Sequence, residues 1–311
     1  MIQFIFNRIL SGIVVIFGLS IFSFLLIHLV PGDPVQIMLG INATPERVAS
    51  LTNHLGLDKP LLVQYGQYIA NVLQGDFGTS LKTGRPVLME IIERFPETVK
   101  LAAFGILIAI VIGISLGVLA AKYKDTIIDR LCTGFATLGV SIPSFWLAIL
   151  LIIVFSVNLG WFPIASGTGF RDMILPAVSL GLVASTMISR LTRNGMVEVL
   201  SNDYIRTARA KGLDERVIIV RHALRNVMIP VVTIVGLQMA SLFGGTVIIE
   251  QVFNWPGLGT LAIGAIMSRD FPVIQGTILF MGIIYVTINI IVDVLYSVID
   301  PRVELSTKEA K

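Results

Sequence analysis

Six apolar stretches without Asp, Glu, Lys or Arg constrain the fold of this sequence more than any other feature. They are Ile9–Val30, Leu101–Ala121, Leu131–Val157, Met173–Ser189, Val227–Ile249 and Phe271–Val292. A helix that crosses a bilayer needs about 20 apolar residues, and only the fourth stretch is clearly shorter. Soluble proteins carry about 25% charged residues, whereas this 311-residue chain carries 14%. We therefore predict an all-α integral membrane protein with six transmembrane helices.

The first stretch is predicted to be a retained helix rather than a cleaved signal peptide. It is too long for the apolar region of a signal peptide, and Pro31-Gly32-Asp33-Pro34 follows it without a cleavage motif. A chain with six spans and its N-terminus inside also ends inside.

Lysine and arginine in the connecting segments predict the orientation. With the N-terminus inside, the loops after the second and fourth stretches carry three and eight basic residues, whereas the two short outside loops carry one each. Basic residues favour the cytoplasmic side, so we expect an N-in, C-in topology. The net charge of +3 then reflects topology and gives no reason to expect a nucleic-acid partner.

Catalytic and metal-binding signatures are not found in the sequence. The single cysteine, Cys132, excludes an internal disulfide and a cysteine-rich metal site. The sequence also has no phosphate-binding loop and no nucleophile elbow. We expect a non-catalytic chain that binds no cofactor or metal itself, and whose energy comes from elsewhere.

Residues 31–97, named here the cap segment, are predicted to form a small external helical domain. Thr44-Pro45 starts one helix that Gly56 ends, Asp58-Lys59-Pro60 starts a second, and a third short helix is expected from Pro86 to Phe95. The pattern fits a docking surface for an external partner and fits a lid over helix ends equally well. Expected domains are residues 1–97, a five-helix core at 98–300 with a loop at 190–226, and a tail at 301–311.

The inside loop, residues 190–226, is the most informative segment. An alanine-rich helix is predicted from Tyr204 to Lys211, Gly212 ends it, and a second helix from Asp214 continues into the fifth span. Positive charge alone would suit anchoring to anionic lipid headgroups. The helix–glycine–helix pattern instead favours docking to a partner protein.

This loop resembles the cytoplasmic loop of bacterial ABC-importer permeases, most closely the dipeptide, oligopeptide and glutathione branch. Arg206-Thr207-Ala208 and Gly212 fill the places of the Glu-Ala-Ala-x3-Gly motif of the wider class, with Arg206 in place of its acid and Arg225 in place of a proline. Further segments match in order and extend the resemblance over essentially the whole chain, among them Gln74-Gly75-Asp76-Phe77-Gly78, Leu159-Gly160-Trp161-Phe162-Pro163 and Phe253-Asn254-Trp255-Pro256-Gly257-Leu258-Gly259.

The resemblance implies a multi-pass permease with the type I ABC-importer fold in a bacterial cytoplasmic membrane. Implied partners are a second homologous permease, two cytoplasmic ATPases that use ATP and Mg²⁺, an extracytoplasmic solute-binding protein, and membrane lipid. The implied function is uptake of short peptides by alternating access. The implied ATPase-coupling residues are Tyr204, Ile205, Arg206, Thr207, Ala208, Arg209, Ala210, Lys211 and Gly212.

Two further candidate sites come from proline-containing breaks. Pro143, between Ser141 and Ser144, interrupts the third stretch and fits either a pore gate or a simple kink. The turn formed by Asn254, Trp255, Pro256 and Gly257 is a candidate contact for the binding protein.

Alternatives within and outside the family stay open at this point. A nickel or metal-chelate importer permease would look similar, although the sequence has no His or Cys cluster. A stand-alone secondary carrier or channel would be expected to keep ionisable residues in mid-membrane, and the six stretches have none. Two glycine pairs, Gly113 with Gly117 and Gly244 with Gly245, are predicted to allow close helix packing.

Overall fold

The computed structural model describes residues 2–29, 33–40, 43–163 and 167–299. The predicted tail, 301–311, Val30 at the end of the first predicted stretch, and residues 31, 32, 41 and 42 of the cap segment lie outside the described residues. The chain divides into two compact units, which are considered one at a time. Unit 1 comprises Met1–Phe4, Thr98–Trp255 and Ile288–Lys311, and unit 2 comprises Ile5–Glu97 and Pro256–Thr287.

Five helical segments in the described part of the chain are long and apolar enough to cross a membrane. They are Ile5–Leu29, Val87–Lys122, Phe170–Leu200, Glu215–Phe253 and Phe271–Val294. A sixth span exists only if the pair Ile127–Ser141 and Ser144–Asn158, bent by 109°, counts as one. The all-α membrane fold is therefore confirmed, whereas the count of six depends on this bent pair.

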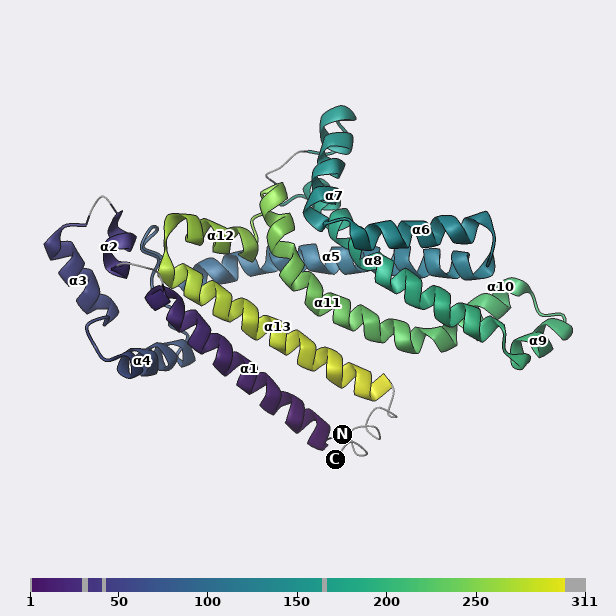
Figure 1. The fold of residues 1–311 in the computed structure, drawn as a ribbon, viewed down its shortest axis with the longest axis horizontal. Helices are drawn as coiled ribbons and strands as arrows, with labels where there is room; N and C mark the ends of the chain where they lie inside the picture. The colour runs from purple at the N-terminus through teal and green to yellow at the C-terminus, as the bar shows by residue number, and fades with distance from the viewer. Residues whose placement is uncertain (1, 30–32, 41–42, 164–166, 300–311) are drawn as a thin grey trace. The chain divides into compact units, whose positions relative to one another are not determined.

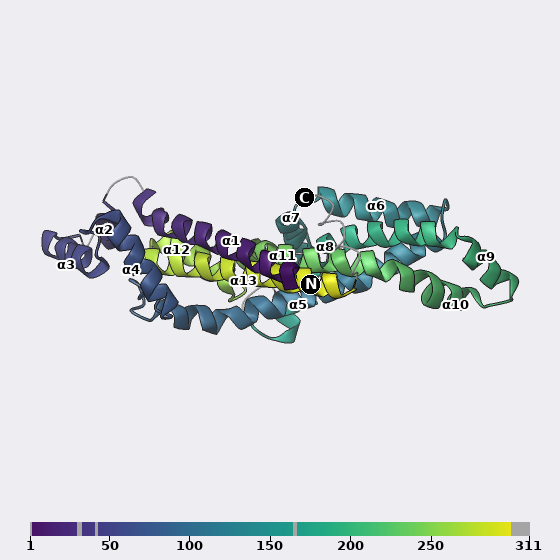
Figure 2. The same cartoon turned by 90° about the horizontal axis from the view of Figure 1, so that it is seen from below.

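Unit 1 is built around α8. Its elements include the second part of α5 (Val87–Lys122), then α6 (Ile127–Ser141), α7 (Ser144–Leu151), the π-helix Ile152–Asn158, α8 (Phe170–Leu200), α9 (Asp203–Ala210), α10 (Glu215–Val217), the π-helix Ile218–Leu224 and α11 (Arg225–Phe253). Figures 1 and 2 show α8 between α6 and α11, which are the two helices that it contacts most. Small and apolar side chains such as Ala184, Ile188 and Met196 fill the buried face of α8.

Glycines bring α5 and α8 into close contact. A Cβ atom added at Gly113 would lie 2.7 Å from Cβ of Ile188, and one at Gly117 would lie 2.7 Å from the carbonyl oxygen of Ser189. The close packing predicted for this glycine pair is confirmed. The second pair behaves differently, because a Cβ at Gly244 would meet nothing within 4 Å.

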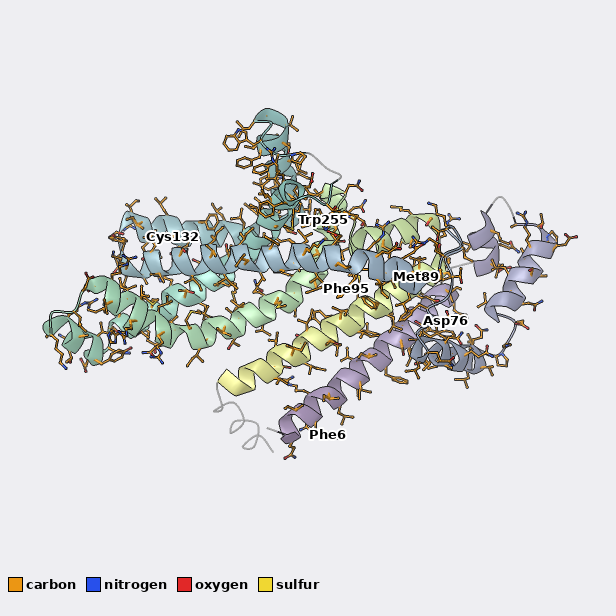
Figure 3. All side chains as sticks on the ribbon, turned by 180° about the vertical axis from the view of Figure 1, so that it is seen from behind. Phe6, Asp76, Met89, Phe95, Cys132 and Trp255 are labelled. Carbon is orange, nitrogen blue, oxygen red and sulfur yellow. The ribbon has the colours of Figure 1, made fainter. Side chains whose placement is uncertain are left out.

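Unit 2 holds the cap segment together with parts of three long helices. Its elements are α1 (Ile2–Leu29), α2 (Pro34–Leu39), α3 (Pro45–Leu55), α4 (Leu61–Leu73), the start of α5, α12 (Leu258–Ser268) and the first part of α13 (Phe271–Ile299). Within it α1 and α13 lie side by side (Figures 1 and 2), and Ser23 Oγ donates to the carbonyl oxygen of Gln275 at 2.9 Å. The opposite side of α1 exposes large apolar groups, including Phe6, which is labelled in Figure 3.

The helix boundaries predicted in the cap segment largely hold. Thr44 Oγ1 accepts from the amide of Arg47 at 3.4 Å at the start of α3, and Gly56 ends the helix in a left-handed conformation. The second predicted helix is α4. Asp270, only 3% exposed, tethers the loop before α5, since it accepts from Ser80 Oγ at 2.6 Å and from the amide of Leu81 at 3.2 Å.

One helix prediction was wrong, because the helix extends beyond its charge-free stretch. The separate helix expected from Pro86 to Phe95 is the first part of α5, which continues through Pro96. The inside segment predicted from residue 190 begins with the last turns of α8, where Thr192 and Met196 are fully buried. The segment between α11 and α13 contains α12, whose Leu258 and Leu261 pack in unit 2.

Candidate functional site

Between α8 and α11, the short helix α9 packs on a stalk, which is the name used here for α10 and the π-helix Ile218–Leu224. Asn202 begins α9 through its carbonyl oxygen, which accepts from the amides of Ile205 at 3.1 Å and Arg206 at 3.3 Å. The predicted stop is confirmed, because Gly212 has φ +75° and its amide donates to the carbonyl oxygen of Arg209 at 2.9 Å. L-residues disfavour this conformation, whereas glycine adopts it freely.

One face of α9 is buried against the stalk. Ile205 is fully buried and Ala208 is 9% exposed, and together they pack on Ile218 of the π-helix and on Leu200 at the end of α8. Since residues three apart on a helix share a face, this pair fixes the rotation of α9. The other predicted coupling residues are exposed: Tyr204, Arg206, Thr207, Arg209, Ala210, Lys211 and Gly212.

Polar contacts at both ends attach α9 to the stalk. Arg209 forms a two-pronged ion pair with Glu215 at 2.7 and 3.1 Å, which raises the pKa of the arginine. Asn226 Nδ2 donates to the Tyr204 hydroxyl at 2.8 Å. Asp214 Oδ1 accepts from the amide of Arg216 at 2.7 Å and so caps the stalk helix. The arrangement makes a short lever whose outer face is exposed and carries Arg206, which lies 3.6 Å from Asp203 of the same helix, and Lys211.

This lever lies at one end of unit 1. Figures 1 and 2 show α9 beyond the turn that joins α5 to α6. That turn contains Lys122 and Lys124, so the two basic loops predicted to lie on one side of the membrane are at the same end of the unit.

The predicted gate residues lie where the third stretch bends. Pro143 precedes α7 with φ −60°, and the axes of α6 and α7 with its π-helical extension differ by 109°. Ser141 Oγ donates to the carbonyl oxygen of Thr137 at 3.1 Å, while Ser144 is the first residue of α7. The predicted break is confirmed, and a bend this large is more than a local kink. A gating role for these residues stays a prediction.

The predicted external turn, residues 254–257, contains one exposed side chain. Asn254 ends α11 in a left-handed conformation and is exposed. Trp255 is only 2% exposed and belongs to the hydrophobic core of unit 1, so its indole does not offer a contact surface. Pro256 is half-buried and Gly257 is buried at the start of α12.

An ion pair that the sequence did not reveal braces the helices behind the lever. Arg193 on α8 donates to both carboxylate oxygens of Asp129 on α6 at 2.6 and 2.7 Å. Asp129 also accepts from the amide of Asp125 and from Thr133 Oγ1. The charge of Arg193 was attributed to topology alone, and no sequence spacing links residues 64 positions apart.

Among the described residues, no group of three or more His, Cys, Asp or Glu side chains is arranged to hold a metal ion. A docking role for α9 stays a prediction.

Comparison with known proteins decides the family. Residues 113–305 match the family described as binding-protein-dependent transport system inner membrane component, and residues 1–102 match the N-terminal family of the same membrane components. The chain belongs to this family. It is a multi-pass permease subunit of the cytoplasmic membrane and not itself an enzyme.

Relatives of the permease match it along its whole length. The glutathione transport system permease proteins GsiC of Salmonella typhimurium strain LT2 and of Escherichia coli strain K12 are each 43% identical over 303 residues, which cover 97% of this chain and 99% of theirs. The resemblance to peptide and glutathione importer permeases found in the sequence is confirmed.

Solved structures confirm the fold. Inward-facing conformations of the MetNI methionine ABC transporter match with TM-scores of 0.56 and 0.57 at 19% and 18% identity, covering 68% of this chain and 97% of the matched chain. An amino acid ABC transporter crystallised with histidines matches with a TM-score of 0.51 at 16% identity. At these identities the likeness concerns the importer-permease fold alone.

Proposed function

We propose that this permease forms part of the membrane path of an importer for short peptides of the glutathione type. The observation that carries the proposal is the 43% identity to glutathione permeases along 97% of the chain. The path works by alternating access and is formed by two permeases. This chain is one of them, and a second, homologous permease is the other. An extracytoplasmic binding protein delivers the peptide, and Asn254 in the outer turn is one point of contact.

The same proposal assigns α9 to ATPase coupling. Its exposed surface carries Arg206 and Lys211, and acidic groups on a cytoplasmic ATPase would complement them. Its inner face is fixed to the stalk through Ile205 and Ala208. Movement of the ATPases on binding ATP and Mg²⁺ is then passed through the stalk to α11, with no flexible linker between them.

Topology and gating follow from the same assignment. The basic loops at the end of unit 1 face the cytoplasm, which gives the N-in, C-in orientation, and the cap segment faces outward. Ser141, Pro143 and Ser144 at the α6–α7 bend act as a gate. The N-terminal domain, 1–97, with its external cap segment then serves delivery outside, and the core, 98–300, serves coupling inside.

Reconstitution tests the substrate. The permease, its permease partner, the ATPases and the binding protein are placed in proteoliposomes, and uptake of labelled glutathione, Ala-Ala and Ni²⁺ is compared with and without ATP. We expect ATP-dependent uptake of the peptides. Uptake of Ni²⁺ alone would identify a metal importer instead, and uptake without ATPases would identify an independent carrier.

Coupling is tested on the buried face of α9. Ala208→Leu inserts three carbon atoms between α9 and Ile218, and Gly212→Pro cannot adopt the positive φ that the turn requires. We expect both variants to insert normally and to hydrolyse ATP with uptake reduced at least about tenfold. Ala70→Leu, at an exposed position of α4, is the matched control. Normal ATP-driven uptake in both α9 variants would contradict the assignment.

A further inference from the structure

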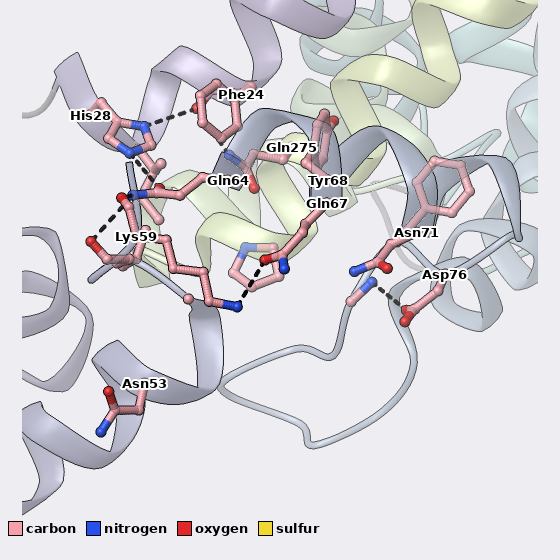
Figure 4. A pocket seen from close by; sticks show the side chains of 16 residues that line it. Phe24, His28, Asn53, Lys59, Gln64, Gln67, Tyr68, Asn71, Asp76 and Gln275 are labelled. Atoms are coloured by element: carbon pink, nitrogen blue, oxygen red, sulfur yellow. Dashed lines mark hydrogen bonds between the residues drawn. The ribbon is translucent and has the colours of Figure 1, made fainter. Parts of the chain in front are cut away.

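The cap segment of unit 2 encloses a pocket that the transport proposal leaves unexplained. It lies between α1, α3, α4 and the start of α13 and has a volume of about 240 Å³. Figure 4 shows it from close by. Its volume is somewhat below the range of about 300–1,000 Å³ typical of drug-sized ligands, which points to a ligand smaller than a drug.

The floor of the pocket combines the ring of Phe24 with polar side chains whose hydrogen bonds are satisfied. Phe24 is 8% exposed and its ring packs edge-on or tilted against neighbouring aromatic rings, including that of Tyr68. Gln64, 9% exposed, donates to the carbonyl oxygens of Leu57 at 3.2 Å and Lys59 at 2.7 Å. These two bonds fix the orientation of the Gln64 amide, so its oxygen faces His28 Nε2 at 3.0 Å. A floor held in this way is formed before any ligand arrives.

The rim differs from the floor, because its polar groups are exposed and incompletely paired. The side-chain amides of Asn53 and Asn71 make no hydrogen bond to any described residue, and both side chains are exposed. Lys59 Nζ donates only to Gln67 Oε1, at 3.3 Å. Asp76 uses one carboxylate oxygen to accept from the amide of Gly78 at 2.8 Å, which leaves the other available to a ligand.

Two side-chain amides on one face of α4 separate the charged groups. Gln67, which contacts Lys59, and Asn71, whose carbonyl oxygen accepts from the amide of Asp76 at 2.9 Å, are four residues apart. Four residues correspond to about 6 Å along a helix axis. In the view of Figure 4, Gln67 and Asn71 lie between Lys59 and Asp76. The rim therefore presents a cation, two amides and a carboxylate in that order.

We propose that this pocket binds a zwitterion of dipeptide size. The carboxylate of the ligand faces Lys59, and its ammonium group faces Asp76. Its peptide group forms hydrogen bonds with the side-chain amides of Gln67 and Asn71. A fully extended dipeptide spans about 7 Å, close to the rise of about 6 Å that separates Gln67 from Asn71 along α4. One side chain of the peptide rests on the aromatic floor. The inference rests on the proposed peptide transport and adds a second place, outside the membrane path, where the cargo is held.

Simple anions and metal ions fit the pocket less well. A phosphate-like anion would meet Lys59 but would be repelled by Asp76, and the rim has only one carboxylate for a cation. A neutral apolar molecule would pair with neither Lys59 nor Asp76 and would form no hydrogen bond with the amides of Asn53 and Asn71.

Equilibrium dialysis on the assembled transporter in nanodiscs, without binding protein or ATP, tests the site. The probe is labelled Ala-Ala, with N-acetyl-Ala-Ala-amide as a competitor that lacks both charges. We expect saturable binding that the blocked peptide does not displace. Lys59→Met and Asp76→Asn should each weaken it at least about tenfold, because each removes a charge-assisted hydrogen bond.

Two substitutions provide matched controls. Lys82→Met and Asp58→Asn remove the same kinds of charge at exposed positions outside the pocket and should leave the affinity unchanged. Binding that is absent, or that survives both Lys59→Met and Asp76→Asn, would overturn the proposal and place any bound peptide elsewhere. Equal weakening by the control variants would also overturn it, because a general surface-charge effect would then explain the result.

A labelling experiment adds a readout at the site itself. Cys132 is the single native cysteine and is buried, so Asn53→Cys places the one accessible thiol of this chain at the rim. Ala-Ala should slow maleimide labelling of Asn53→Cys and not of Lys82→Cys, in a transporter whose partners lack cysteine. Unchanged labelling of Asn53→Cys at saturating Ala-Ala would contradict the site.

Uptake measured in parallel separates this inference from the proposed function. Peptide uptake without binding in the pocket rejects the pocket alone. Binding in the pocket without peptide uptake rejects the proposed transport function alone.

Discussion

The α5–α8 interface and the α9 lever are both parts of unit 1, but they are held together in opposite ways. Between α5 and α8 the backbones approach so closely that a single added carbon at Gly113 or Gly117 would lie under 3 Å from its neighbours. In contrast, α9 buries only Ile205 and Ala208 and exposes the rest of its surface.

This difference separates a rigid frame from an adaptable surface. The interior of a packed interface transmits displacement because it has no free volume, whereas an exposed helix face can exchange partners without unfolding anything. The ion pairs show the same contrast, since the side chains of Arg193 and Asp129 are 26% and 6% exposed and those of Arg209 and Glu215 are 44% and 46% exposed. Substitutions should therefore damage stability in the frame and function in the lever.

The largest effect is expected from Asp129→Asn. Without the carboxylate, Arg193 keeps its charge in a mostly buried position and loses a two-pronged partner, which should lower the free energy of unfolding by about 3 kcal/mol. Dye labelling of the buried Cys132 during thermal unfolding measures the change. Arg193→Met in the same background removes the unpaired charge and should restore part of the loss; equal destabilisation by the single and double variants would show that the pair is not coupled.

A smaller effect is expected from Gly113→Ala. The new Cβ would lie 2.7 Å from Cβ of Ile188 and 2.9 Å from the carbonyl oxygen of Ser185. Overpacking of this kind costs about 1–3 kcal/mol, against which alanine gains up to about 1 kcal/mol of helix propensity. We expect a net destabilisation of about 1–2 kcal/mol in the same labelling assay.

Gly244→Ala is the matched control for Gly113→Ala, because a Cβ there meets nothing within 4 Å. It should be neutral or slightly stabilising. If both alanine variants behaved alike, the distinction between a packed and an open glycine pair would be wrong.

The smallest effect on stability is expected from Glu215→Gln in the lever. Exposed ion pairs contribute about 0.2–1 kcal/mol, so the unfolding temperature should scarcely change. ATP-driven uptake should nevertheless fall, because Arg209 loses the partner that orients it on α9. A loss of stability comparable to that of Asp129→Asn would place the lever in the frame and remove the contrast between the two regions.

Much of the lever was predictable from the sequence because local signals define it. Gly212 supplies the positive φ that ends α9, and Asp214 caps the stalk helix that follows. Thr44 and Gly56 bound α3 for the same reason. Such signals act over a few residues, so they survive in the sequence whatever the rest of the chain does.

The contacts between distant segments were not predictable in this way. The pairing of Asp129 with Arg193 and the tether from Asp270 to Ser80 join residues 64 and 190 positions apart. Two similar glycine pairs gave the same prediction, yet only Gly113 and Gly117 face a neighbouring helix closely. Which face of a helix meets a partner depends on the packing of the whole unit.

The sequence by itself determined that the chain is a membrane permease, since uncharged stretches long enough to span a bilayer have few alternatives and the motifs follow in family order. It also located α9, through capping and glycine conformation. Only the tertiary structure decided that the third stretch bends by 109°, that α9 turns Ile205 and Ala208 inward, and that α1, α3, α4 and α13 enclose a polar-rimmed pocket. These features depend on side chains brought together from distant positions, where packing and hydrogen bonding select one arrangement among many that local preferences allow.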